Sequence, residues 1–135
     1  MPEGAGPDLR HRRPQARDRS AALEARMNAG LYLAQRATAA ILGVAVIIHL
    51  ATIMYAVRGG LTAGEILDRT SGHAGVFAFY AVFVVAAAIH APIGLRSVLR
   101  EWTVWRGRSL DVAALGFAGL ILVLGLRAAY AVYAA

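Results

Sequence analysis

The chain lacks cysteine and lysine and has few acidic residues. With no cysteine among its 135 residues, it cannot form disulfide bonds, ligate an iron–sulfur cluster or bind haem through sulfur. All 14 basic residues are arginine, which we interpret as the codon bias of a GC-rich bacterial genome without a mechanistic role. Of the 8 acidic residues, only Asp111 falls within a long apolar stretch, at its very start, which argues against a transport path through these stretches.

The chain has an excess of apolar residues. Hydrophobic residues make up 59% of it and its mean hydropathy is +0.56, which is too apolar for an ordinary soluble domain. The net charge of +6 does not indicate nucleic-acid binding, because the arginines stand at the ends of apolar segments and in the N-terminal arm, where topology signals are found. We therefore expect a small protein whose partners include membrane lipid but no nucleic acid.

Three apolar runs are long enough to cross a bilayer. The first covers residues 37–57 without a fixed charge and would measure roughly 30 Å as a helix, the thickness of the hydrocarbon core. The others cover about 74–96 and 110–133, and Arg127 in the third run can extend its charge to the interface. Residues 31–135 are therefore predicted to form an all-α membrane protein with three transmembrane helices.

The distribution of arginine predicts the orientation of these helices. Seven arginines precede the first span and four follow the second, whereas the loop between these spans holds two arginines beside two acids. The positive-inside rule then predicts a cytoplasmic N-terminus and an outside C-terminus. We expect a multi-pass protein of the bacterial inner membrane. A secretory signal peptide is not expected, because no apolar stretch appears before about residue 31.

Residues 1–30 are expected to form a cytoplasmic arm. Residues 1–19 are rich in proline, glycine and charge and are predicted to be disordered. A short helix over residues 20–27, capped by Ser20, would lie on the membrane or against a partner.

The loop between the first two spans carries clear turn signals. Gly59 and Gly60 should end the first helix. The spacing of Thr62 and Glu65 predicts a capping box at the start of a further short helix.

Two histidines, His49 and His90, lie inside the first and second apolar runs. A titratable side chain is costly in hydrocarbon and is therefore a functional candidate, and neutral imidazole is a good ligand for iron. Counted from the flanking arginines, the two imidazoles would differ in depth by about 10 Å, too far for both to bind one metal ion. Each histidine would need its own metal centre and a second ligand. The alternative without a metal is a histidine that is hydrogen-bonded across a helix interface. Zinc is disfavoured because the acids and cysteines of such sites are absent.

Two segments resemble the cytochrome b membrane anchors of succinate dehydrogenases and fumarate reductases. Gln-Arg-Ala-Thr-Ala-Ala-Ile-Leu-Gly, followed by His49, is similar to their first helix. His90-Ala-Pro-Ile-Gly94-Leu-Arg96 is similar to their second-helix pattern of histidine, three residues, glycine, one residue and arginine. Together the similar segments cover roughly residues 31–101.

The resemblance implies a haem b-binding anchor that holds a flavoprotein and an iron–sulfur subunit and exchanges electrons with quinone. His90 would ligate the haem nearer the iron–sulfur subunit, and His49 would ligate a second haem. Arg36 and Thr38 would lie near a quinone or a haem propionate, and Arg96 near a propionate. The candidate quinone-binding residues on the cytoplasmic side are Arg36, Gln35, Tyr32 and Thr38, and those on the outer side include His73, Tyr55, Glu65 and Asp68.

The chain also departs from this family. Gln35 stands where one-haem members often have histidine, and Ala39 replaces a glycine. One-chain, two-haem anchors have more helices and more ligand histidines, so a second chain must complete each centre here. A homodimer or a different small subunit would serve equally well.

Two alternatives remain open at this stage. In the first, the chain belongs to the same family but only His90 binds haem, while His49 packs against a neighbouring helix. In the second, the chain is a haem-free scaffold or assembly protein that associates through small-residue patterns such as Gly125-xxx-Ala129.

Overall fold

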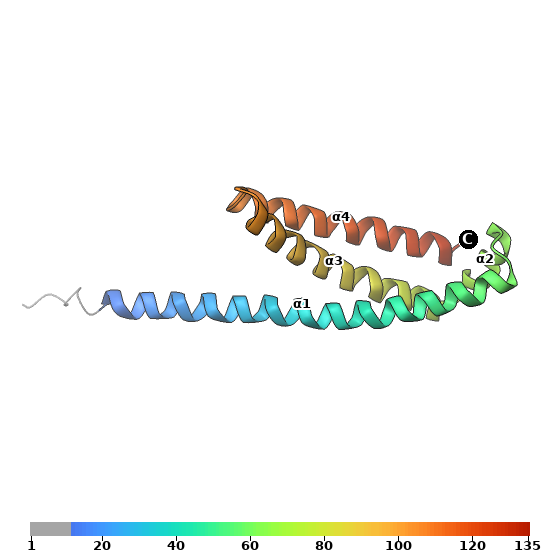
Figure 1. Ribbon diagram of the computed structural model, residues 1–135, viewed down its shortest axis with the longest axis horizontal. Helices are drawn as coiled ribbons and strands as arrows, with labels where there is room; N and C mark the ends of the chain where they lie inside the picture. The colour runs from blue at the N-terminus through green and yellow to red at the C-terminus, as the bar shows by residue number, and fades with distance from the viewer. Residues whose placement is uncertain (1–11) are drawn as a thin grey trace, which may run out of the picture. The chain divides into compact units, whose positions relative to one another are not determined.

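In the residues that the structure describes, all regular secondary structure is helical. The computed structural model describes the backbone of residues 12–135 and the side chains from residue 17 onward. Its four helices are α1 (Arg12–Gly59), α2 (Ala63–Thr70), α3 (Ala74–Trp102) and α4 (Arg108–Tyr133), labelled in Figure 1. The chain divides into two units, Met1–Leu33 and Ala34–Ala135, which we describe separately.

Three of the helices are long and apolar enough to cross a membrane. They lie over Arg17–Gly59, Ala74–Trp102 and Arg108–Tyr133. This finding confirms the predicted all-α class with three candidate spans. The cytoplasmic position of the N-terminus and the outside position of the C-terminus stay predictions.

In the N-terminal unit, helix α1 begins earlier than the sequence indicated. Residues 1–19 were expected to be disordered, yet the helix starts at Arg12, while residues 1–11, including His11, lie outside the described part of the chain. Pro14 falls in the first turn, where a missing backbone N–H costs nothing, so it does not prevent helix formation. Ser20 is not a cap as expected, because it lies within the helix and its Oγ donates to the carbonyl oxygen of Arg17 at 2.9 Å.

The second unit contains the close pairing of α3 with α4. Figure 1 shows these two antiparallel helices side by side, and the only side chain among the described residues that is below 2% exposed, Leu110, lies at the start of α4. A Cβ added at Gly125 would lie 2.6 and 2.8 Å from the two γ-methyl carbons of Val84. The absence of a side chain at Gly125 therefore permits this close approach.

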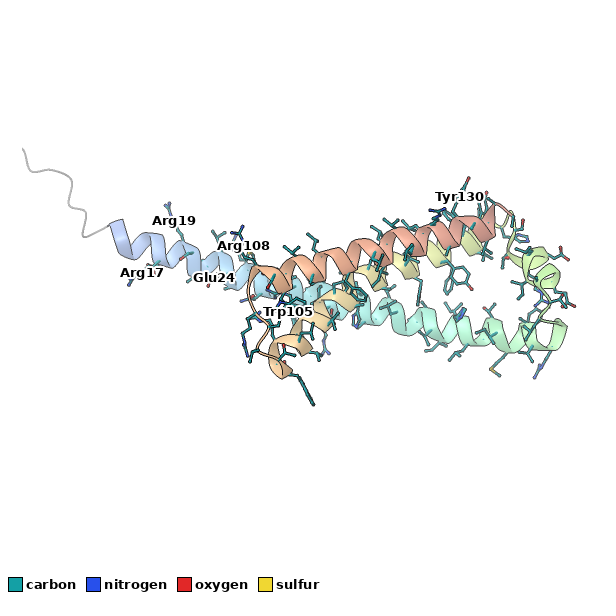
Figure 2. All side chains as sticks on the ribbon, turned by 90° about the horizontal axis from the view of Figure 1, so that it is seen from above. Arg17, Arg19, Glu24, Trp105, Arg108 and Tyr130 are labelled. Atoms are coloured by element: carbon teal, nitrogen blue, oxygen red, sulfur yellow. The ribbon has the colours of Figure 1, made fainter. Side chains whose placement is uncertain are left out.

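Polar and aromatic contacts secure both ends of the α3–α4 pair. Near the turn between the helices, which Figure 2 marks by Trp105 and Arg108, Arg96 Nε donates to Asp111 Oδ1 at 2.6 Å. At the opposite end, Phe77 of α3 packs against Tyr130 and Tyr133 of α4 with ring centroids 6.5 and 5.3 Å apart. The backbone N–H of Gly72 also donates to the carbonyl oxygen of Tyr133 at 2.9 Å.

The loop between α1 and α3 has the predicted capping box. Thr62 Oγ1 accepts from the N–H of Glu65 at 3.3 Å, and Glu65 Oε2 accepts from the N–H of Thr62 at 2.9 Å. Arg69 Nη2 donates to the carbonyl oxygen of Gly60 at 2.7 Å and so places a cation at the C-terminal end of α1. Gly60 has φ +103°, and a Cβ there would fall on the Glu65 carboxylate. The sequence-based prediction that Gly59 and Gly60 end the first helix is confirmed.

The close approach at Gly125 predicts a large effect of a single methyl group. Gly125→Ala should lower the free energy of unfolding by about 1–3 kcal/mol, because Val84 must move to admit the new Cβ. The matched control is Gly119→Ala in the same helix, where nothing lies within 4 Å and the better helix propensity of alanine should leave stability equal or raised. Unfolding of the detergent-solubilised protein in increasing SDS measures both variants, and Val84→Ala should rescue Gly125→Ala. Equal stability of the two alanine variants would contradict the packing.

The capping box predicts a pH dependence in α2. Hydrogen bonds from the side chain and then the backbone of Thr62, with a smaller contribution from the charge of Arg69, lower the pKa of Glu65 below its ordinary value of 4.5. Stabilisation of α2 by this carboxylate should therefore be present above pH 4.5 and be lost as the pH falls through the lowered pKa.

Carbon-13 NMR titration of the Glu65 carboxyl group would measure this shift. Thr62→Val should return the pKa toward 4.5, because it removes the hydroxyl donor. Thr70→Val serves as the control, since the Thr70 hydroxyl donates to the carbonyl oxygen of Ile66 and does not touch Glu65. An unchanged Glu65 pKa in Thr62→Val would show that the hydroxyl is not the cause.

Candidate functional site

Both intramembrane histidines lie between α1 and α3, and each contacts the opposite helix. His90 of α3 lies beside Thr38, and His49 of α1 lies beside Tyr80. Moving along α1 from Thr38 to His49 corresponds to moving back along α3 from His90 to Tyr80, as antiparallel helices require. The two sites are therefore separated by about 16 Å along the helix axis.

This separation exceeds the roughly 10 Å obtained by counting helical rise from the flanking arginines. The count treated Arg36 and Arg96 as markers of the same height. In the structure, Gln35 and Thr38 both contact His90, so Arg36 lies close to the level of that histidine. Arg96 lies nearly two turns beyond His90 along α3. The arginines that flank the apolar parts of α1 and α3 are therefore not at the same height.

Both ring nitrogens of His90 face polar atoms of α1. His90 Nδ1 lies 3.3 Å from Thr38 Oγ1 and 3.3 Å from the backbone carbonyl oxygen of Gln35. His90 Nε2 lies 3.5 Å from the side-chain Nε2 of Gln35. Contacts to Nδ1 from the main chain and a hydroxyl orient the imidazole ring and direct Nε2 toward the Gln35 carboxamide.

The Gln35 side chain fits between the two motif residues of α3. A Cβ added at Gly94 would lie 3.2 Å from Gln35 Nε2, so glycine one turn after His90 makes room for the amide. The side-chain oxygen Oε1 of Gln35 is buried and has no hydrogen-bond partner among the described residues. An unpaired buried amide oxygen is unfavourable in hydrocarbon and can accept a hydrogen bond from a bound group.

The second site joins His49 to Tyr80. Tyr80 Oη and His49 Nδ1 are 3.3 Å apart, and the two rings pack edge to face with centroids 5.9 Å apart. No hydrogen-bond partner is seen for His49 Nε2 among the side chains that the structure describes, residues 17–135. Tyr80 holds the ring by one nitrogen and leaves the other open.

Between the two sites, α1 and α3 line two adjoining apolar hollows that are open to the outside. The hollow beside the His90 site has a volume of about 300 Å³ and the one toward the His49 site about 410 Å³. Both are lined by Ile41 and Val82, and the first also by Thr38, Ala86 and Ile89. The small residues of both helices leave room here for a flat apolar group or for lipid chains.

The remaining predicted site residues lie in different surroundings. Arg96 forms its salt bridge with Asp111, at the start of α4. Arg36 is exposed in the second unit, whereas Tyr32 belongs to the N-terminal unit. His73 is exposed at the N-terminal end of α3 without a side-chain capping bond. None of these positions tests the assignment of the residue to quinone or to a propionate.

Sequence reasoning missed Tyr80 and Asp111 as partners of site residues. Tyr80 precedes His90 by nearly as many residues as separate Thr38 from His49. This spacing indicates that Tyr80 lies opposite His49, but only if Thr38 is already known to lie opposite His90. Among the described residues, no group of three or more His, Cys, Asp or Glu side chains could hold a metal ion.

The comparison with protein families agrees with the resemblance seen in the sequence. The model of the succinate dehydrogenase/fumarate reductase transmembrane subunit family matches residues 10–128 and so includes both histidines, the first two candidate spans and most of the third. No curated protein and no solved structure matches the chain. From the extent of the family match, the chain belongs to the succinate dehydrogenase/fumarate reductase transmembrane subunit family.

Proposed function

We propose that the chain is a haem b-binding membrane anchor that passes electrons between a flavin- and iron–sulfur-containing catalytic module and membrane quinone. The observation that carries this proposal is the fixed imidazole of His90, held through Nδ1 by Thr38 and the Gln35 carbonyl oxygen inside a membrane subunit of this family. Iron-binding histidines commonly have their second ring nitrogen anchored in this way. When bound, haem supplies a one-electron carrier.

The residues around His90 fit such a group. Its Nε2 is the nitrogen left for iron, and the Gln35 carboxamide that faces it at 3.5 Å is a long, weak contact that a stronger ligand can replace. The adjoining hollow is apolar, and Ala86 and Ile89 in its lining would lie against a flat ring system. If a ligand displaced the Gln35 amide, its unpartnered Oε1 could accept a hydrogen bond in the new position.

We propose His49 as the ligand of a second haem. Tyr80 orients its Nδ1 and the opposite nitrogen is open, which repeats the arrangement at His90 with a different anchoring group. At about 16 Å apart along α1, the two histidines serve separate centres. Each centre lacks a second axial ligand from this chain, so the anchor pairs with a second membrane chain or with its own copy across a two-fold axis.

Membership in the family supports a proposal for the location and partners of the chain. We propose that the chain lies in the bacterial inner membrane, with the flavoprotein and iron–sulfur subunits on the cytoplasmic side near the His90 end. Quinone would bind on the same side near Arg36 and Gln35, where a guanidinium can donate to a quinone oxygen. Tyr32 of the N-terminal unit stays a separate candidate. The exposed His73 is the candidate on the outer side.

The haem-free scaffold is the weaker alternative. Its small-residue pattern includes Gly125, which contacts Val84 within the same chain and is therefore used for the internal α3–α4 pairing. The one-haem alternative differs from the two-haem proposal only at His49, whose contact with Tyr80 would then serve helix packing.

Haem content per chain tests these alternatives together. We expect the purified complex to contain haem b in a pyridine haemochrome assay, with His90→Ala and His49→Ala each removing a different haem because each removes one axial ligand. His73→Ala is the matched control, since this exposed residue lies at the end of α3 and should leave haem content unchanged. Absence of haem from the wild-type complex would refute the haem-binding function, and a single haem lost only in His90→Ala would leave the one-haem alternative.

A further inference from the structure

Thr38 is the only buried polar side chain in the described part of the chain, with 6% of its surface exposed. It lies one turn after Gln35 on α1 and faces His90 across the helix interface. The family resemblance associates this position with a quinone or a propionate. Its burial against an imidazole indicates a different role.

The hydroxyl proton of Thr38 is already hydrogen-bonded to a main-chain oxygen. Thr38 Oγ1 donates to the carbonyl oxygen of Ala34 at 2.7 Å. The competing acceptor, the carbonyl oxygen of Gln35 at 3.2 Å, is also a main-chain oxygen. Because a hydroxyl has one proton, Thr38 Oγ1 can only accept a hydrogen bond from His90 Nδ1.

The second neighbour of Nδ1 leads to the same assignment. The carbonyl oxygen of Gln35, 3.3 Å from Nδ1, has no proton to donate. Two acceptors thus face one ring nitrogen, and this arrangement is favourable only when Nδ1 carries the proton. A neutral imidazole protonated at Nδ1 has its lone pair on Nε2.

The Gln35 side chain cannot by itself determine which nitrogen of His90 carries the proton. Its amide group faces His90 Nε2 at 3.5 Å and can present either a donor or an acceptor after rotation by half a turn. The choice of tautomer therefore depends on the two acceptors at Nδ1. Of these, only the Thr38 hydroxyl can be removed by substitution.

We infer that Thr38 is a positioning residue that selects the Nδ1-protonated tautomer of His90 and keeps the Nε2 lone pair available for a metal ion. The tautomer itself is a property of the chain without haem. Its consequence for haem rests on the proposed function. An acceptor at Nδ1–H makes the ring a stronger donor to iron and favours the ferric state, so Thr38 also lowers the midpoint potential of the haem at His90.

The first experiment measures the tautomer in the haem-free, full-length protein. Nitrogen-15 NMR of histidine-labelled protein in lipid nanodiscs distinguishes Nδ1–H from Nε2–H, and the spectrum of His90→Gln identifies the His90 signals. We expect Nδ1–H in the wild type and in Thr38→Ser, which keeps the hydroxyl. Thr38→Val, which has nearly the same shape without the hydroxyl, should shift the population toward Nε2–H. A wild-type Nε2–H tautomer, or an unchanged population in Thr38→Val, would overturn the inference.

The second experiment uses the assembled complex and a redox titration of its haem absorbance. Thr38→Val should raise the midpoint potential of the haem lost in His90→Ala, while Thr38→Ser should retain the wild-type value. A purely structural role would lower haem content without shifting the potential of the remaining haem, and that result would overturn the inference. If Thr38→Val retains no haem, the NMR comparison decides. A wild-type complex without haem would refute the proposed function and leave the tautomer assignment to be decided by NMR.

Discussion

A polar group inside a bilayer must find its partner within the protein, and this constraint determines how α1 meets α3. Hydrocarbon offers no hydrogen bonds, so each imidazole in a membrane span is costly until another residue pairs with it. His90 is paired by Gln35 and Thr38, and His49 by Tyr80. Between these two levels the helices line open apolar hollows. The polar contacts thus define the register of the α1–α3 pair.

The α3–α4 pair follows a different physical principle. Lipid chains are as apolar as the side chains, so helices in a membrane associate through close packing and polar contacts rather than through the hydrophobic effect. Gly125 admits Val84 at the centre of the pair, and the Arg96–Asp111 salt bridge joins the end near the α3–α4 turn. This firm pair presents one face of α3, with His90, toward α1. The tightly packed α3–α4 pair and the loosely filled α1–α3 interface together leave room for the flat cofactor proposed above.

Local features of the chain were predictable, because they depend on residues close in sequence. The spans follow from uninterrupted apolar runs, and the capping box at Thr62 and Glu65 follows from a spacing of three residues. The start of α1 was not predictable from composition, since a helix tolerates proline in its first turn and the charged residues 17–19 are exposed on it. Ser20 shows the same weakness, because a good capping residue also bonds to carbonyl oxygens within a helix.

The sequence by itself determined that the chain is an all-α membrane protein, and it identified His90 and His49 as the candidate ligands. Hydropathy and motif spacing carry this information because bilayer thickness and helical rise convert residue counts directly into span lengths. Only the tertiary structure decided that Tyr80 pairs with His49, that Arg96 pairs with Asp111 and that Thr38 contacts His90. These pairings depend on the antiparallel register of helices far apart in the chain. That register results from packing and polar contacts between helices, so local sequence does not specify it.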